Sequence, residues 1–308
     1  MTDVPELFKW PYDKGHRCHL WLDPKVSSRS RSVFRLRGIH RNKWMIHSSF
    51  EGHLKAYGLL PFAKMLSGNQ KFQLDPSLLT ALVDRWRPET HTFHLSCGEL
   101  TPTLKDVSMI TGLPISGKPF VATAISSMWP IELGNRLGVQ IPESTRRGER
   151  PRGVPLKWLE DNFSVIPSGQ SPLEPYLLAY ILYIPGTLFP TTHGDIVSAS
   201  LIKFAEIIVD EPLPPYPTYS LGSAMLAHTY RGLCDATQKN SPAGKGQIFV
   251  VSYEFLQLWS WEYIPVGRPR IVNPIHSYNS NHEEHAPLTM ASRWTHVVKH
   301  WAIDVVCR

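Results

Sequence analysis

The sequence lacks any apolar run long enough to cross a membrane. A spanning helix needs about 20 apolar residues in a row, whereas the longest stretch here, Leu177 to Ile184, is short and is stopped by Pro185. The first ten residues scatter Asp3, Glu6 and Lys9, so they also lack the basic start and apolar core of a secretory signal. We therefore expect a soluble chain with no membrane partner.

Cysteine is scarce, with four residues in the 308 of the chain. Cys18, Cys97, Cys234 and Cys307 lie far apart and form no Cys-x-x-Cys pair, whereas a disulfide framework needs dense, paired spacing. Reduced thiols in the cytosol or nucleus are the better interpretation. Cys97 and Cys234 have apolar neighbours in the sequence, so we expect both to be small buried residues.

A zinc motif is also lacking. His16, Cys18 and His19 lie together near the start, but structural zinc needs four ligands in paired clusters, and no second half follows at a suitable distance. His282-Glu-Glu-His285 is one residue short of the zincin spacing, which requires histidines at i and i+4 of a helix. Both groups are interpreted as solvated loops, and no metal is expected.

Three further enzyme classes are not supported by a complete motif. Thr192-His-Gly-Asp195 lacks the dispersed ligands of a two-metal phosphatase, and Gly244-Lys-Gly246 lacks the length and the following Ser or Thr of a P-loop. A transaminase needs a lysine in a cofactor pocket with an acidic partner, and no lysine here has a distinctive setting. We expect no catalytic residue and no cofactor.

The residues that are present are typical of a globular domain. Apolar residues make up 42% and charged residues 19%, which excludes a disordered chain. Ten Trp and 27 Pro are many, and they predict large packed side chains and sharply ended helices.

Apolar spacing predicts a mainly α, multi-helix globular domain. Asp75-Pro76 opens one helix with a capping carboxylate and a first-turn proline, and the alternation in 91–101 predicts a small β-hairpin. The predicted helices are two short ones within 51–74 and single ones over 76–87, 103–111, 156–163, 175–184, 197–209, 221–238 and 250–263, with a weak one over 122–128 and another from 292. The helix over 175–184 is nearly all apolar and is expected to be central.

The predicted organisation is a basic N-terminal extension over residues 1–50 and one domain over 51–308. A subdivision is considered near 142–155, where prolines and glycines predict an exposed loop. Since the helix from 292 reaches the last residue, we expect the C-terminus to be truncated and the chain to be a fragment of a longer protein.

Positive charge is concentrated before residue 50. The segment from Pro24 to Phe50 contains no Asp or Glu, yet it carries seven cations in a chain whose net charge is +6. Either it contacts nucleic-acid phosphates, or it is a solvated basic tail. The candidate contacts are Lys25, Arg29, Arg31, Arg35, Arg37, Arg41 and Lys43, with a weaker second patch at Arg146, Arg147, Arg150 and Arg152.

Several motifs in a fixed order make the chain resemble the plant mobile domain from about Glu51 to Trp301. Where that family often has Trp-Gly, this chain has Leu221-Gly222, so one aromatic anchor is missing. The matching segments are Leu82–Leu95, Cys97–Val107, Thr111–Pro114, Gly117–Pro119, Leu188–Pro190, Gly222–Ala227, Tyr230–Cys234 and Leu256–Glu262. The motif residues expected to be structural are Trp86, His94, Gly98, Glu99, Asp106, Gly112, Gly222, Trp259 and Trp261.

Glu99 and Asp106 fall in the best-matched motif. An exposed carboxylate pair can perform acid–base chemistry. Alternatively, the two organise the hairpin and the next helix start through hydrogen bonds to backbone, and this second interpretation is favoured. Arg85 and Arg87 form either a binding edge or ion pairs with nearby glutamates.

The resemblance, and not the composition, implies a biological setting. The family occurs in plant transposable elements and in host genes derived from them, and its host members are nuclear. They are associated with meristem maintenance, genome integrity and transposon silencing, and some are fused to or partnered with a phosphatase of the protein phosphatase 7 type. The family label "aminotransferase-like" implies no transaminase chemistry.

We therefore predict a non-enzymatic nuclear interaction or scaffold module in transposon silencing, genome maintenance and meristem development. Its partners would be nuclear proteins, among them a protein phosphatase 7-type enzyme. The alternative is a direct DNA-binding module, host-encoded or transposon-encoded, and the third is an enzyme of unknown type. A scaffold predicts an exposed apolar patch, whereas an enzyme predicts a pocket with convergent polar groups.

Overall fold

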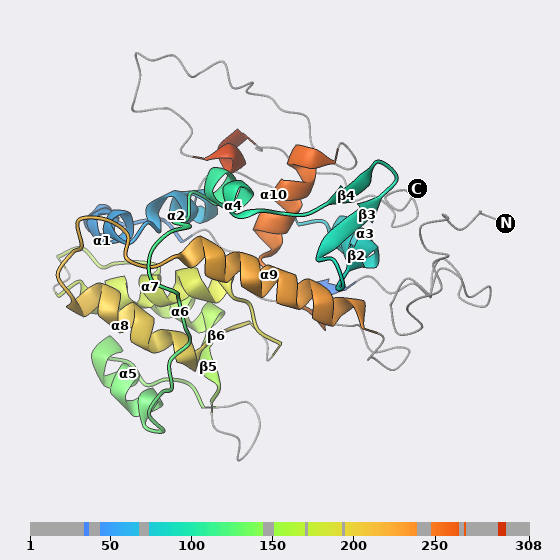
Figure 1. Ribbon diagram of the computed structural model, residues 1–308. Helices are drawn as coiled ribbons and strands as arrows, with labels where there is room; N and C mark the ends of the chain where they lie inside the picture. Colours follow the sequence, from blue (N-terminus) through green and yellow to red (C-terminus); the bar gives the residue numbers. More distant parts are fainter. Residues whose placement is uncertain are drawn as a thin grey trace, which may run out of the picture. The chain divides into compact units, whose positions relative to one another are not determined.

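The computed structural model describes residues 34–36, 44–67, 74–143, 151–169, 172–192, 195–238, 248–264, 268 and 289–293 (Figure 1). They belong to two compact units, each assembled from segments distant in the sequence. Unit 1 draws on Met1–Leu36, Gln70–Ile110 and Leu226–Arg308, and unit 2 on Arg37–Asn69 and Thr111–Met225. The predicted mainly helical fold with a small hairpin is confirmed.

Unit 1 combines helices with two small sheets. Its strands pair as β1 with β7, parallel, and as an antiparallel sheet of order β2-β3-β4. The elements are β1 (Arg35–Leu36), α3 (Pro76–Arg85), β2 (Trp86–Arg87), β3 (Thr92–Leu95), β4 (Gly98–Leu100), α4 (Leu104–Thr111), the second part of α9 (Leu221–Thr237), β7 (Ile248–Phe249), α10 (Tyr253–Tyr263) and the 3-10 helix η7 (Met290–Arg293).

Asp75 caps α3 as its sequence position predicts. Its carboxylate accepts hydrogen bonds from the backbone N–H of Ser77 (2.8 Å) and of Leu78 (3.2 Å), and Pro76 occupies the first turn. The backbone N–H of Asp75 itself donates to the side chain of Gln257 on α10 at 2.6 Å. One residue therefore satisfies the start of α3 and ties it to a second helix of unit 1.

The predicted hairpin is confirmed, and it has a third strand. Phe93 faces Leu100 across β3 and β4, while Trp86 of β2 faces Phe93 on the other side. Gly98 adopts a φ of 124° at the turn, which side chains rarely allow. The pattern of the sequence assigned Trp86 to the end of the preceding helix, but its backbone leaves that helix and extends.

Unit 2 is built around α7, the predicted central helix. Every residue from Leu177 to Leu188 is buried, and α7 contacts α5, α6, α8 and β6. The elements are the 3-10 helix η4 (Ser48–Phe50), α1 (Glu51–Ala56), α2 (Leu60–Ser67), α5 (Trp129–Leu137), β5 (Gly153–Pro155), α6 (Leu156–Phe163), α7 (Glu174–Leu188), β6 (Ile196–Ser198), the 3-10 helix η5 (Ala199–Leu201), α8 (Ile202–Asp210) and the first part of α9.

The helix α7 does not end where its apolar run does. It passes through Pro185, and the backbone N–H of Phe189 donates to the carbonyl of Pro185 at 2.9 Å. Proline removes one backbone hydrogen-bond donor from the helix. The packing of the buried residues around Pro185 stabilises the helix despite this loss. Within the described part of the chain, no helix is both long and apolar enough to span a membrane.

The weak helix predicted over 122–128 is wrong. The helix of this region, α5, begins only at Trp129 and ends at Leu137, followed by the capping residue Gly138 with a φ of 69°. It buries Trp129, Leu133 and Leu137, which are spaced four residues apart and therefore share one face. This spacing is present in the sequence, but no helix over these residues was predicted from it.

Arg136, in the last turn of α5, links this helix to two other helices of unit 2. The Arg136 guanidinium donates to the carboxylates of Asp210 (2.6 and 3.0 Å) and of Glu174 (2.8 Å). The hydrogen bond to Asp210 is the main reason why the pKa of Arg136 is raised. The helices α7 and α8 are thus both linked to α5.

The loop predicted over 142–155 contains a strand, and residues 144–150 lie outside the described part. Residues 153–155 pair antiparallel with β6, so the helix predicted over 197–209 begins as a strand and becomes α-helical only at Ile202. A Cβ at Gly153 would lie 1.9 Å from the carbonyl oxygen of Val197. This close approach requires glycine, and no periodicity in the sequence reveals it. Both sides of the proposed subdivision belong to unit 2.

Candidate functional site

The family-motif aromatics of unit 1 form a packed cluster. Trp86 is fully buried, with its ring centre 4.8 Å from that of Phe93 and 5.1 Å from that of Tyr230. Its indole N–H donates to the sulfur of Cys234 at 3.3 Å. Trp259 of α10 also packs against Phe93, with ring centres 5.1 Å apart. These motif residues therefore join β2, β3, α9 and α10 into one core.

The expectation for the two central cysteines is wrong. Cys97 is exposed because it lies in the tight turn between β3 and β4, and Cys234 is half-buried because α9 turns it toward Trp86. Ser96 and Gly98, which flank Cys97, are exposed as well. Sequence proximity was a poor guide to burial at both positions.

Asp106 closes the start of α4. Its carboxylate accepts from the backbone N–H of Thr103 (2.7 Å) and from the Thr103 hydroxyl (2.8 Å), and its own N–H donates back to that hydroxyl at 3.3 Å. This reciprocal pair is a capping box. The other carboxylate oxygen accepts a hydrogen bond from the Tyr263 hydroxyl, and this bond raises the pKa of Tyr263 to about 12.

Glu99 has different partners, in the hairpin. Its carboxylate accepts from the Thr92 hydroxyl at 2.8 Å and lies 3.5 Å from the ring nitrogen Nε2 of His94. His94 and Glu99 also face each other in the strand register. Glu99 therefore bonds within the hairpin, whereas Asp106 bonds at the start of α4 and to Tyr263 of α10, so the two carboxylates hold separate elements.

The remaining motif residues have backbone or packing roles. Gly112 adopts a φ of 72° directly after α4, and the Gly222 N–H donates to the Pro114 carbonyl at 2.8 Å at the start of α9. Trp261 is fully buried on α10. Gly222 is buried as well, and Gly112 is half-buried.

Most of the predicted nucleic-acid contacts lie outside the described residues. Arg35 is in β1 of unit 1, where it pairs with Ile248, and Arg152 is in unit 2, where its carbonyl accepts from the Ala199 N–H at 3.0 Å. The other candidates lie outside the described part: Lys25, Arg29, Arg31, Arg37, Arg41, Lys43, Arg146, Arg147 and Arg150, as do His16, Cys18, His19, His282, His285, Gly244 and Gly246. Across the described ranges, no three His, Cys, Asp or Glu residues gather into a metal site.

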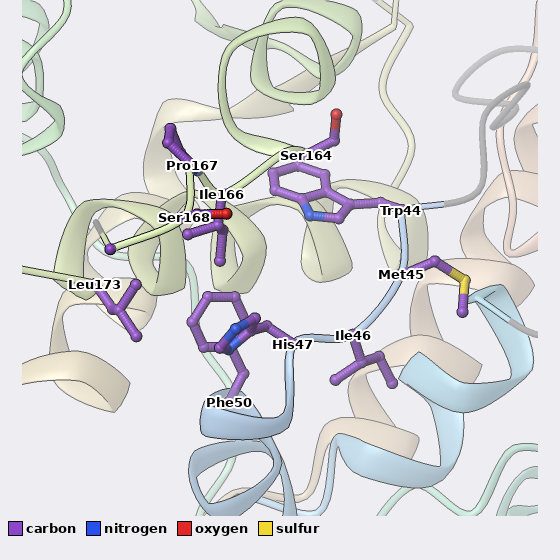
Figure 2. Close-up of a pocket in the computed structure, with 11 residues that line it drawn as sticks. Trp44, Met45, Ile46, His47, Phe50, Ser164, Ile166, Pro167, Ser168 and Leu173 are labelled. Carbon is purple, nitrogen blue, oxygen red and sulfur yellow. The ribbon is translucent and has the colours of Figure 1, made fainter. Parts of the chain in front are cut away.

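A pocket in unit 2 is the concave site that the sequence did not reveal. It has a volume of about 510 Å³ and lies between residues 44–50 and the loop that joins α6 to α7 (Figure 2). Its described lining is mostly apolar or aromatic and includes no Asp, Glu, Lys or Arg. The lining residues are Trp44, Met45, Ile46, His47, Phe50, Ser164, Ile166, Pro167, Ser168, Gly169 and Leu173.

Aromatic contacts with α7 hold the first wall of the pocket. The ring of Trp44 meets Tyr180 edge-on at 5.3 Å and Tyr183 at 4.9 Å, and Phe50 lies 5.9 Å from Tyr180. Burial raises the pKa of Tyr180, so its hydroxyl stays protonated. The predicted extension over residues 1–50 therefore contributes buried side chains to unit 2, and its large aromatics were the available signal.

His47 supplies the polar part of this wall. Its Nδ1 accepts from the backbone N–H of Ser49 at 3.3 Å and so caps η4. This bond leaves Nε2 as the ring nitrogen that carries the proton in the neutral imidazole. Ser164 and Ser168 belong to the other wall, so the lining combines apolar side chains with a few polar ones (Figure 2).

Comparison with known families shows which family the chain belongs to. The family model described as plant mobile domain matches residues 62–306. The chain belongs to the plant mobile domain family. No solved structure matches it.

Similar proteins of Arabidopsis thaliana carry the domain within longer chains. Protein MAINTENANCE OF MERISTEMS is 36% identical over 200 residues, which cover 64% of this chain and 39% of that protein. Protein MAIN-LIKE 1 is 36% identical over 199 residues, 64% of this chain and 37% of its own. Serine/threonine-protein phosphatase 7 long form homolog is 34% identical over 232 residues, 74% of this chain and 16% of its own. The chain thus spans less than two-fifths of each of these relatives.

The plant mobile domain match divides the pocket. The wall made by Ser164 to Leu173 lies inside the matched range, whereas the wall made by Trp44 to Phe50 precedes it. The pocket therefore combines residues of the plant mobile domain with a segment that the family model does not cover.

Proposed function

We propose that this plant mobile domain is a non-enzymatic interaction module of the nucleus that binds a protein partner through the pocket of unit 2. The observation that carries this proposal is the apolar and aromatic lining of that pocket together with apolar side chains exposed beside it. The biological setting that we propose is meristem development, genome maintenance and transposon silencing. The relative named MAINTENANCE OF MERISTEMS supports the meristem part of this setting.

The surroundings of the pocket favour a protein ligand over a small molecule. Met45, which lines the pocket, is 66% exposed, and Val165, between two lining residues, is 78% exposed. Small-molecule sites bury most of their ligand inside the cavity, whereas an apolar rim that continues onto the surface is typical of protein contact sites. We propose an apolar side chain of a partner as the group that enters the pocket.

The geometry of the family motif supports a role without catalysis. Asp106 uses both carboxylate oxygens for a helix cap and for Tyr263, and Glu99 is engaged within the hairpin. Burial lowers the pKa of His228 to about 4, so this imidazole is neutral at physiological pH. Each of these titratable side chains already has a stabilising or buried position.

A phosphatase of the protein phosphatase 7 type is the partner that we propose first. One similar protein bears that name and covers most of this chain within a much longer one. The name of this relative is the reason for proposing such a phosphatase before other partners. The experiment below would also identify another nuclear protein as the partner.

The test is affinity purification of the tagged chain from plant nuclei treated with nuclease, comparing Leu173→Glu with Ile131→Glu. Leu173 lines the pocket at the start of α7, where a carboxylate suits the helix dipole and leaves the fold intact. Ile131 is exposed on α5 and does not line the pocket. We expect a protein partner to co-purify in stoichiometric amount with the original chain and with Ile131→Glu. The amount recovered with Leu173→Glu should be at least about tenfold lower, because the variant would bury an unpaired charge at the contact.

Two outcomes would reject the pocket as the binding site. One is that no protein co-purifies with the chain after nuclease treatment. The other is equal retention of the partner by both variants, provided that their melting temperatures match that of the original chain.

Direct DNA binding remains a second candidate because seven cations without an acid occupy 25–43. It predicts that the affinity for a DNA duplex falls steeply with salt, with a logarithmic slope of about 0.9 per phosphate contact. Replacing Arg29, Arg31, Arg35 and Arg37 with glutamine should reduce this slope by up to about 3.6. Fluorescence anisotropy at several salt concentrations measures it, and the lack of salt-dependent binding to duplex or single strand would eliminate this candidate.

A further inference from the structure

His47 is the one titratable side chain among the described residues that line the pocket of unit 2. It precedes η4, and its φ of −76° and ψ of 138° are the extended geometry of a helix N-cap. Its Nδ1 accepts a hydrogen bond from the backbone N–H of Ser49 at 3.3 Å. The ring also packs against Phe50, with ring centres 5.4 Å apart (Figure 2). One imidazole therefore belongs both to the lining and to the start of the helix that carries Phe50.

Protonation of this imidazole would remove its capping bond. The bond needs a lone pair on Nδ1, and both ring nitrogens are donors in the charged imidazole. The Ser49 N–H would then face another N–H, and the start of η4 would lose its side-chain cap. Phe50, at the end of η4, is buried and lies 5.9 Å from the ring of Tyr180 on α7. Loss of the cap would therefore weaken the pocket wall that Phe50 helps to form.

The described lining also offers the charged imidazole no carboxylate. Acidic side chains on the neighbouring elements have other partners. Glu51 of α1 lies 3.9 Å from Nζ of Lys64, and Glu174 of α7 accepts a hydrogen bond from Arg136 at 2.8 Å. Glu160 of α6 accepts one from a tyrosine hydroxyl of α7 at 2.5 Å. An apolar group in the pocket would exclude water from the imidazole, and burial without a carboxylate disfavours its charged form.

Other titratable groups on these elements do not share this behaviour. Burial lowers the pKa of His53 on α1, so it becomes charged only at a lower pH than an exposed imidazole. Burial raises the pKa of Tyr180, so its phenol stays neutral. Asp161 of α6 lies 3.1 Å from Nζ of Lys157. Because imidazoles change charge between about pH 5 and 8, we expect a mild acidification to act on the pocket through His47.

We propose that His47 makes the pocket a pH-sensitive site, which accepts an apolar group while the imidazole is neutral and releases it when the imidazole is protonated. The neutral ring caps η4 and completes an uncharged lining. The protonated ring loses the cap and places an unpaired charge beside the ligand. The inference rests on the proposed function of the pocket and adds the regulation of that site.

The experiment titrates the whole purified chain with Nile red, a neutral apolar dye, and follows the dye fluorescence at two pH values, about 7.5 and about 5.5, on either side of the usual imidazole titration. An imidazole with an ordinary pKa of about 6.5 is about nine-tenths protonated at the lower value. If only the neutral form binds, the affinity of the original chain should be about tenfold lower there. Leu173→Glu should lose the dye at both pH values, which places it in the pocket.

His47→Asn is the matched control, because an asparagine oxygen caps a helix as well as an imidazole nitrogen does and carries no charge at either pH. Its affinity for the dye should change less than about twofold between the two pH values. Equal affinity of the original chain at both values, or an equal fall in His47→Asn, would overturn the proposal and leave the pocket as an apolar site. Lack of saturable binding at either pH, or binding that Leu173→Glu leaves intact, would instead reject the pocket, and with it both this inference and the proposed function.

Discussion

Replacing Gly232 with alanine is expected to lower the free energy of unfolding by about 3 kcal/mol or more, a large effect for one methyl group. A Cβ at this position of α9 would lie 1.9 Å from the carbonyl oxygen of Val250 and 2.8 Å from a methyl group of Val251. The nearest atom belongs to backbone between β7 and α10, so no rotation of a flexible side chain relieves the overlap. Urea denaturation followed by tryptophan fluorescence measures the loss.

Gly52 offers the matched control for this substitution. It lies in α1, where an added Cβ would meet no atom within 4 Å. Alanine there should stabilise the protein by about 0.5–1 kcal/mol because it removes the conformational freedom of glycine in a helix. A Gly232→Ala protein as stable as the original would show that α9 and the Val250 segment do not approach as closely as described.

Gly232 shows which features of the fold could be predicted from the sequence and which could not. It lies within Tyr230–Cys234, one of the segments that carry the family resemblance, and the helix around it was predicted correctly. The reason for a glycine inside a helix lies in a segment that follows after a gap in the described chain. Local sequence patterns predict a helix, but they do not predict which distant segment of the chain packs against it.

The same distinction separates the confirmed elements from the missed ones. The cap at Asp75 and the hairpin depend on residues close in the sequence, and both were predicted. The pairing of β5 with β6 joins segments that are about forty residues apart in the sequence, and it was mistaken for a loop and a helix start. Non-local pairing has no period in either strand when each is only three residues long.

The pocket was missed for a related reason. Its walls, Trp44 to Phe50 and Ser164 to Leu173, are more than a hundred residues apart, and neither contains a recognisable motif. Basic neighbours made the first wall resemble a solvated extension. Its apolar side chains, above all Trp44, were nevertheless incompatible with a fully solvated tail, and they are the signal that the sequence contained.

Replacing Trp86 with alanine is the second substitution with a large expected effect, a loss of about 3–5 kcal/mol in the free energy of unfolding. The indole is fully buried, and it packs edge-on against Phe93 and Tyr230. Removing it leaves a cavity that rigid neighbours on β3 and α9 cannot fill. Denaturant unfolding gives the magnitude, and faster amide hydrogen exchange in β3 locates the damage.

Two further variants identify which property of Trp86 matters. Trp86→Phe keeps an aromatic ring but loses the N–H that donates to Cys234, so we expect an intermediate loss of about 1–2 kcal/mol. Trp158→Ala removes a half-buried tryptophan in unit 2 and should cost about 1 kcal/mol, because less apolar area returns to water. Equal losses for Trp86→Ala and Trp158→Ala would contradict the assignment of Trp86 to the centre of a packed core. A loss in Trp86→Phe as large as in Trp86→Ala would instead show that the indole N–H, rather than the volume of the ring, dominates its contribution.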